Sequence, residues 1–134
     1  MVSLQDDYEK AMDVLADLAQ EYEKWVRADL QRLQAAFEQA EALDGEKRTH
    51  LIQTDLFRVA HDMKGQGATF DYELVTQIGN HLCRYVERKS FFGPAEMEAV
   101  SKHIQALVFV IDHRLTGDGG AEGQKLAAQI EGIT

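Results

Sequence analysis

The residues best suited to chemistry are a histidine and a lysine three positions apart, His61 and Lys64, within the stretch RVAHDMKGQGATF that ends at Phe70. A neutral imidazole nitrogen is a good nucleophile near pH 7, and a lysine at i+3 is its direct neighbour on a helix surface. If His61 carried a phosphoryl group, the Lys64 ammonium would offset the negative charge on the phosphoryl oxygens. This pair therefore indicates phosphoryl chemistry, with His61 as the acceptor.

The same stretch has the apolar spacing of a helix that buries one face. With about 100° of turn per residue, a set of apolar or small residues falls within roughly 60° of Leu56. His61 then points about 140° and Gly65 about 180° from that centre, so both face away from the predicted core. The predicted buried face consists of Ile52, Leu56, Val59, Ala60, Met63, Gly67 and Phe70.

Two glycines inside this helix need a reason, because each costs about 1 kcal/mol relative to alanine. Gly67 lies on the apolar face, where contact with a neighbouring helix would account for it. Gly65 faces solvent, and the close approach of a partner is the best explanation for a missing side chain there. We expect the docking surface to consist of Gly65 with Phe57, Arg58, Gln66, Ala68 and Arg84.

Composition limits the classes of protein to consider. The chain has 134 residues, 45% of them hydrophobic, which predicts one globular domain with a real core. The formal net charge of −9 argues against nucleic acid and anionic membrane as partners. No apolar run approaches the roughly 18 residues of a membrane span, and the N-terminus has no signal-peptide pattern. The single cysteine, Cys83, predicts a buried small hydrophobe in a reducing, cytoplasmic setting.

The N-terminal segment predicts a long helix with an interruption. Residues 3–43 contain neither glycine nor proline, but the apolar spacing slips by one position at Trp25–Val26. A single helix of about 60 Å would be too long for a compact domain to cover, so we expect a break or sharp bend between residues 16 and 26. The apolar positions are Leu4, Tyr8, Ala11, Leu15, Leu18, Tyr22 and Trp25 before the slip, and Val26, Leu30, Leu33, Phe37 and Ala40 after it.

Local signals place the remaining helices. Asp44-Gly45 should end the first segment, and the helix that carries His61 should run from about residue 49 to about residue 70. Asp71 is a suitable N-cap for a helix that continues to about residue 89. Gly93-Pro94 should break the chain and begin a last long helix that ends near residue 115.

The C-terminal segment begins with the glycine-rich run Gly117-Asp118-Gly119-Gly120, which predicts a flexible tail. Its apolar residues Leu126, Ala127, Ile130 and Ile133 could instead form a short docking helix. We therefore predict an all-α fold. It consists of an antiparallel up-down four-helix bundle with an additional N-terminal helix in residues 1–116, and a tail in residues 117–134.

The sequence from Ala60 to Ala68, AHDMKGQGA, resembles the signature of histidine-containing phosphotransfer (HPt) domains, and the resemblance covers roughly residues 20–115. It implies that His61, on the second helix of a four-helix bundle, accepts a phosphoryl group on Nε2 from a receiver-domain aspartate and passes it to another receiver. It implies that Lys64 is the charge partner and that Gly65 admits the receiver. It further implies Mg²⁺ on the receiver, with no cofactor or metal held by this chain.

Such a protein would be a cytoplasmic phosphorelay intermediate of a two-component system and a monomer. Its partners would be receiver domains of response regulators or hybrid sensor kinases. The chain shows no GxxxxGK[ST] loop, so kinase activity of its own is not expected. Gln66 departs from the family pattern, as do Asp62 and the corner Phe70-Asp71-Tyr72, while Leu82 and Glu87 could match a leucine and a glutamate on the following helix. The other histidines are expected at the surface without a role: His50, His81, His103 and His113.

The sequence has features of other functional classes as well. His61-Asp62 also resembles the dyad of HD-type metal-dependent phosphohydrolases, which would need further ligands such as His50 and Asp112, and Lys64 is unfavourable beside a metal. A di-iron bundle needs paired Glu-x-x-His motifs, which are missing from the sequence. A sensor-kinase dimerisation segment also carries an exposed histidine on a pair of helices, but this chain has no room for the ATP-binding lobe that would accompany it. A non-catalytic helical adaptor with an incidental surface histidine stays open.

Overall fold

The computed structural model describes residues 3–134, and its regular elements are all helices. The prediction of an all-α fold is therefore confirmed. No helix within these residues is both long enough and apolar enough to cross a membrane. The elements are α1 (Leu4–Glu41), α2 (Gly45–Leu51), the π-helix η1 (Ile52–Leu56), α3 (Phe57–Gly67), the 3₁₀ turn η2 (Ala68–Phe70), α4 (Glu73–Arg88), α5 (Pro94–Asp112) and α6 (Gly120–Glu131).

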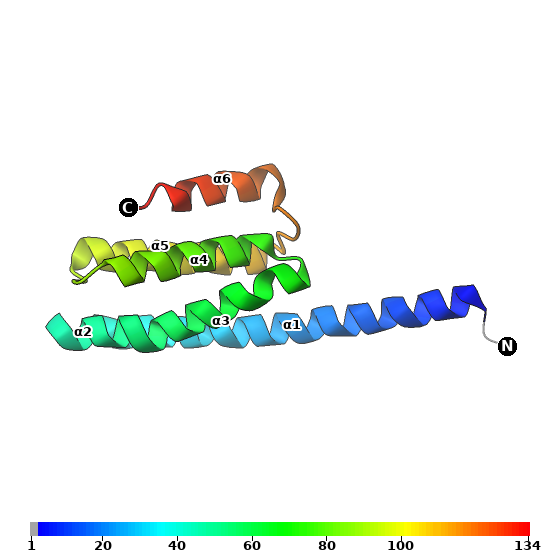
Figure 1. Ribbon diagram of the computed structural model, residues 1–134, viewed down its shortest axis with the longest axis horizontal. Helices are drawn as coiled ribbons and strands as arrows, with labels where there is room; N and C mark the ends of the chain where they lie inside the picture. The colour runs from blue at the N-terminus through cyan, green and yellow to red at the C-terminus, as the bar shows by residue number, and fades with distance from the viewer. Residues whose placement is uncertain (1–2) are drawn as a thin grey trace.

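The C-terminal half of α1 packs with α3, α4 and α5 around one apolar core, and successive long helices run in opposite directions (Figure 1). We call residues 22–133 the packed body. Because apolar side chains recur on one face of each helix, each can turn that face inward. Side chains without solvent exposure at the centre include Leu33, Ile52, Leu56, Leu74, Ile78, Leu82, Leu107 and Ile111.

The break expected between residues 16 and 26 is wrong, because α1 is one uninterrupted helix of 38 residues. Its N-cap is Ser3, whose Oγ accepts a hydrogen bond from the amide of Asp6 at 3.1 Å. Tyr22 and Val26 are buried, whereas all residues from 3 to 21 are exposed. Trp25 is 55% exposed, so the buried side of α1 runs from Tyr22 to Val26 and Leu30 without the slip that counting Trp25 suggested. The backbone hydrogen bonds of the exposed half are made within α1 itself, and no glycine or proline interrupts them here.

The first helical segment does end just before Asp44-Gly45, since α1 ends at Glu41, but two other predicted boundaries are wrong. The helical run that carries His61 begins at Gly45 and not near residue 49, and Gly45 has a φ of +54° that suits glycine. Asp71 has a φ of +66° and Tyr72 is the N-cap of α4 in its place. The amide of Tyr72 donates to the carbonyl of Gly67 at 2.8 Å, so Asp71 provides the left-handed turn that closes the preceding helix. Gly93-Pro94 does begin α5 as predicted.

The C-terminal segment forms the docking helix and not the flexible tail. α6 packs against α4 and α5, with Ala127 and Ile130 buried (Figure 1). At its end, Nε2 of Gln77 on α4 donates to a carboxylate oxygen of Glu131 at 2.6 Å. Apolar spacing therefore outweighs the glycine-rich opening in this segment.

A surface position for His103 was predicted wrongly, since its side chain is 0% exposed. Its Nδ1–H donates to the carbonyl of Ala99 at 2.7 Å, and its Nε2 lies 2.8 Å from Nδ1 of the half-buried His81. Burial lowers the pKa of His103 to about 4, so the ring is neutral near pH 7. Cys83 is buried as predicted, and burial raises its pKa to about 11.

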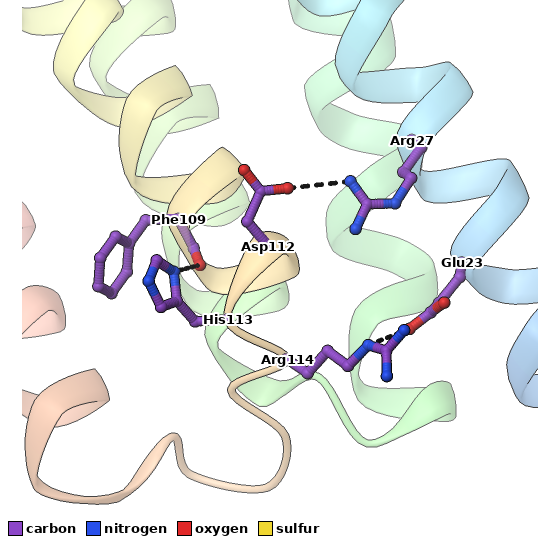
Figure 2. A network of polar contacts seen from close by, with 6 residues as sticks. All are labelled: Glu23, Arg27, Phe109, Asp112, His113 and Arg114. Atoms are coloured by element: carbon purple, nitrogen blue, oxygen red, sulfur yellow. Dashed lines mark hydrogen bonds and ion pairs between the residues drawn. The ribbon is translucent and has the colours of Figure 1, made fainter.

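Polar contacts join α1 to the C-terminal end of α5, close to where α1 leaves the packed body (Figure 2). Nη1 of Arg27 donates to Oδ1 of Asp112 at 2.9 Å, and Nε of Arg114 forms an ion pair with Oε1 of Glu23 at 3.0 Å. Next to them the ring of Tyr22 stacks on Phe70, with 4.5 Å between the ring centroids. These contacts lie at the point where α1 leaves the body.

Candidate functional site

His61 lies on the solvent side of α3 and its side chain is exposed, as the helical spacing predicted. Its ring packs beside Phe57, one turn earlier, with 5.8 Å between the centroids and 31° between the planes. Among residues 3–134, no hydrogen-bond partner is found for either of its ring nitrogens. On the other side of α3, Ala60, Met63 and Gly67 are buried. The imidazole is therefore open to an approaching reactant.

Lys64 is half-buried, and its Nζ donates a hydrogen bond to Oδ1 of Asn80 on α4 at 3.1 Å. The helices approach closely at this point because residue 79 is a glycine. A Cβ on Gly79 would lie 3.0 Å from Cβ of Lys64 and 3.4 Å from the carbonyl oxygen of Ala60. The aliphatic stem of Lys64 therefore lies along α4, and Asn80 holds the ammonium beside the next turn from His61.

The two glycines of α3 have opposite surroundings. A Cβ on Gly67 would meet Oγ1 of Thr76 at 2.6 Å and the carbonyl oxygen of Tyr72 at 2.8 Å, so contact with α4 requires glycine at position 67. A Cβ on Gly65 would meet no atom within 4 Å. Packing within residues 3–134 therefore explains Gly67 and leaves Gly65 unexplained.

Thr76 on α4 fixes the backbone around both glycines. Its hydroxyl donates to the carbonyl of Lys64 at 2.9 Å and accepts from the amide of Ala68 at 2.8 Å. The last turn of α3 is thus tied to α4, although Gly65 by itself would loosen it. Sequence reasoning missed Thr76 and Asn80. The glycine at position 79, inside an otherwise regular helix, was the signal for a close helix contact there.

His61 stands on a ridge of α3 between two depressions. On the side of α1, a groove contains Arg58 and Asp62 of α3 together with Asp29, Arg32 and Asp55. Burial raises the pKa of Asp29, and the neighbouring Arg32 opposes that shift. On the other side, a hollow is lined by Gln53, Phe57, Val86 and Glu87.

The predicted docking residues occupy different parts of this surface. Phe57 lies in the hollow beside α4, and Arg58 lies in the groove beside α1. Gln66 and Ala68 are exposed at the end of α3. Arg84 lies on α4 one turn beyond Asn80 and lines a separate hollow that faces α6. Phe57 and Arg58 thus lie in separate depressions, Gln66 and Ala68 lie at the exposed end of α3, and Arg84 belongs to a third hollow on α4.

The structure does not assemble the metal ligands considered for an HD-type enzyme. Among residues 3–134, no three His, Cys, Asp or Glu side chains are placed to share a metal ion. His50 is on α2, at one end of the packed body, whereas α5 ends at Asp112 at the other end (Figure 1). Asp112 is paired with Arg27 (Figure 2). His50, His61 and Asp112 thus do not form one site.

Comparison with models of known protein families, with curated proteins and with solved structures returned no match. Support for a function therefore comes from the geometry at His61 and from the motif around it. An exposed imidazole, a cation on the next turn and open space above Gly65 can together accommodate a group transferred by a partner protein.

Proposed function

We propose that this chain is a histidine phosphotransfer protein, in which His61 carries a phosphoryl group between aspartates of receiver domains in a two-component phosphorelay. The observation that carries the proposal is the exposed imidazole of His61 with Lys64 on the next turn and unobstructed space at Gly65. The resemblance of AHDMKGQGA to the HPt signature agrees with it. In this interpretation α1, α3, α4 and α5 form an antiparallel up-down four-helix bundle, with His61 on its second helix.

The proposed transfer needs one nucleophile on this chain. The lone pair of His61 Nε2 attacks the phosphorus of a receiver's aspartyl phosphate, while Nδ1 keeps its proton. The N–P bond forms as the P–O bond to the aspartate breaks, and the bonding pair leaves with the carboxylate. Transfer to the next receiver reverses these bond changes. The receiver's acidic residues would hold Mg²⁺, which offsets charge on the phosphoryl oxygens.

Lys64 supplies the charge that this chain contributes. Its ammonium is directed along α4 toward Asn80, and the same donor can reach a phosphoryl oxygen on the neighbouring turn by a change of rotamer. One charge-assisted contact of this kind is worth about 1.5–3 kcal/mol. Lys64 is therefore proposed to stabilise the transferred group, while His61 alone forms the covalent bond.

Gly65 and its neighbours are proposed to admit the receiver. In-line transfer requires the reacting atoms to come within about 3–3.5 Å, so the receiver's loop must approach the helix surface closely. Gly65 presents no side chain there, and Gln66 and Ala68 are exposed on the same end of α3. Phe57 and Arg58 would contact the receiver on either side of His61, and Arg84 would contact the edge of the receiver.

The test is incubation of the full chain with phosphorylated receivers from the same cell. Phosphate is expected on His61 as an acid-labile, alkali-stable adduct. His61→Gln should abolish labelling without loss of helical content, because the side chain is exposed. His50→Gln is the matched control. His50 is also exposed on a helix, but eleven residues of helix place it about 16 Å from His61 along the helix axis. Labelling that persists in His61→Gln would contradict the proposal.

A further inference from the structure

The first half of α1 extends far beyond the packed body (Figure 1). We call Leu4–Glu21 the arm. Every residue in it is exposed, yet it carries large apolar side chains that are close together. A contiguous apolar surface of this kind marks an interaction site, whereas single exposed apolar residues do not. The large apolar side chains of the arm are Leu4 (88% exposed), Tyr8 (64%), Met12 (45%), Val14 (58%), Leu15 (57%) and Leu18 (48%).

Leu4, Tyr8, Leu15 and Leu18 form a seam along one side of the arm, with Met12 and Val14 about 80° to either side of it. Leu4, Tyr8, Ala11, Leu15 and Leu18 follow the alternating spacing of four and three residues that is typical of a coiled coil. At about 100° per residue, the seam lies on the same side of α1 as the residues from Tyr22 onward that enter the core. The arm therefore continues the core-facing side of α1 beyond the end of the body. Most of its acidic residues point the opposite way: Asp6, Glu9, Asp13 and Asp17.

We propose that the seam binds the arm of a second copy of this chain, antiparallel, around a two-fold axis near Ala11. The spacing of the seam is almost symmetric about that residue. Leu4 then lies opposite the partner's Leu18, and Tyr8 opposite the partner's Leu15. Ala11 meets the partner's Ala11, and the small side chains allow the two backbones to approach closely. The same surface thus serves both copies, as a two-fold interface requires.

The position of the packed body decides the orientation. In a parallel pair with facing seams, each body would occupy the space of the other, because the body covers that same side of α1 from Tyr22 onward. In the antiparallel pair each arm lies beyond the end of the partner's body. The arm is about 27 Å long, which allows full overlap of the two arms before either body is reached. The ion pairs of Arg27 and Arg114 in Figure 2 lie at the base of each arm, on the body side.

Large side chains make up the apolar surface of the arm. A specific interface of standard size buries about 800 Å² on each partner, and one tyrosine can bury about 150–250 Å². Four of the six large side chains in the seam region are more than half exposed in the single chain. The arm also holds six acidic residues and one lysine, Lys10, so the two copies repel one another. Salt should screen that repulsion and strengthen the pair.

The experiment measures the mass of the full chain in solution by sedimentation over a range of concentrations. We expect a reversible dimer of twice 15.1 kDa, with an association constant that rises with salt. Leu15→Glu should lower that constant by more than about 100-fold, because each dimer would bury two carboxylates. Gln20→Glu is the matched control, with the same added charge on the opposite side of the arm, and should leave the dimer intact. The arm contributes nothing to the core, so both variants should fold.

Cross-linking tests the orientation. Ala11→Cys should form an intermolecular disulfide readily, because the two-fold axis brings position 11 next to its counterpart. Leu4→Cys should not, because its counterpart would lie about 21 Å away along the helix. A monomer at every concentration would overturn the proposal and leave a different protein as the occupant of the seam. Efficient cross-linking through position 4 would overturn the antiparallel arrangement.

The proposed dimer differs from the monomer that the resemblance implies, and it is independent of the proposed phosphotransfer. His61 is on α3, outside the arm, and remains exposed when the arms pair. Leu15→Glu should therefore accept phosphate on His61 at the parent rate. The two proposals can therefore fail separately. If Leu15→Glu dissociates the dimer but the parent protein shows no labelling of His61, the arm interface is supported and the phosphorelay function is contradicted.

Discussion

Lys64 on α3 donates a hydrogen bond from Nζ to Oδ1 of Asn80 on α4, over 3.1 Å. The bond joins the proposed charge partner of His61 to the helix that supports α3. The lysine is therefore placed by a residue 16 positions later in the sequence. The consequence is that Asn80 acts on phosphotransfer through Lys64, as a positioning residue.

Lys64→Ala should slow transfer from a phosphorylated receiver by roughly 10- to 100-fold, from loss of one charge-assisted contact of about 1.5–3 kcal/mol. Asn80→Ala should slow it less, since the ammonium remains but is no longer held. The double variant should be no slower than Lys64→Ala alone, because the two residues act through one contact. Rates measured by single-turnover transfer check this. If Asn80→Ala slows transfer by the same factor in the Lys64→Ala variant as in the parent protein, Asn80 does not act through Lys64.

Substitution of the two α3 glycines should have opposite effects on stability. Gly65→Ala should raise the free energy of unfolding by up to about 1 kcal/mol, because the added Cβ meets nothing within 4 Å. Gly67→Ala should lower it, because the added Cβ would lie 2.8 Å from the backbone nitrogen of Thr76. Urea unfolding of both variants measures the difference. Similar effects in the two variants would show that α4 can move away from position 67.

A larger residue at position 65 separates docking from folding. Gly65→Leu and Gly65→Glu should fold, since the space around this position is open. Both should block transfer to His61, because the receiver's loop could no longer come within the roughly 3–3.5 Å needed for in-line attack. A melting temperature and a transfer rate for each variant check this. Normal transfer in Gly65→Glu would place the docking surface elsewhere.

The buried His103 should make stability depend on pH. Its folded pKa of about 4 lies below the unfolded value near 6.5, so the unfolded chain binds a proton more readily between these values. Stability is therefore fully present above pH 6.5 and falls as the pH drops toward 4, by about 2 kcal/mol between pH 7.5 and pH 5. His81 adds in the same direction, because burial and the nearby Arg88 lower its pKa as well.

His103→Leu should flatten this dependence when urea unfolding is measured at pH 7.5 and pH 5. Carboxylates that titrate in the same range are common to both proteins, so they cancel in the comparison. His50→Gln, at an exposed histidine, should keep the parent dependence. If the free energy of unfolding of His103→Leu changes between pH 7.5 and pH 5 as much as that of the parent protein, the buried ring does not cause the pH dependence.

Tyr22→Phe should stabilise the protein by roughly 1 kcal/mol. The hydroxyl of Tyr22 is buried without a hydrogen-bond partner among the described residues, and such a group costs about 1–3 kcal/mol. Burial also raises the pKa of this phenol. The phenylalanine ring keeps the stacking on Phe70. Tyr72→Phe is the control and should show no such gain; a loss of stability in Tyr22→Phe would indicate that a water or another group satisfies the hydroxyl.

Features that depend on neighbours within a turn or two of helix could be predicted from the sequence. The outward direction of His61 and the buried positions of Ala60 and Met63 follow from helical periodicity, which is local. The start of α5 at Gly93-Pro94 follows from the fixed φ of proline. The contrast between Gly65 and Gly67 also came from periodicity, because it depends on which face of one helix each residue occupies.

Other features were decided only by the tertiary structure. Whether Asp71 caps one helix or closes the one before it depends on how α3 and α4 meet, since aspartate tolerates both conformations. The burial of His103 depends on His81, which another helix supplies, and the partner of Lys64 depends on the approach of α4 at Gly79. Which part of α1 is buried depends on where the packed body ends, at Tyr22. A sequence records which residues a helix can bury, but only the packing of distant segments determines which of them find a neighbour.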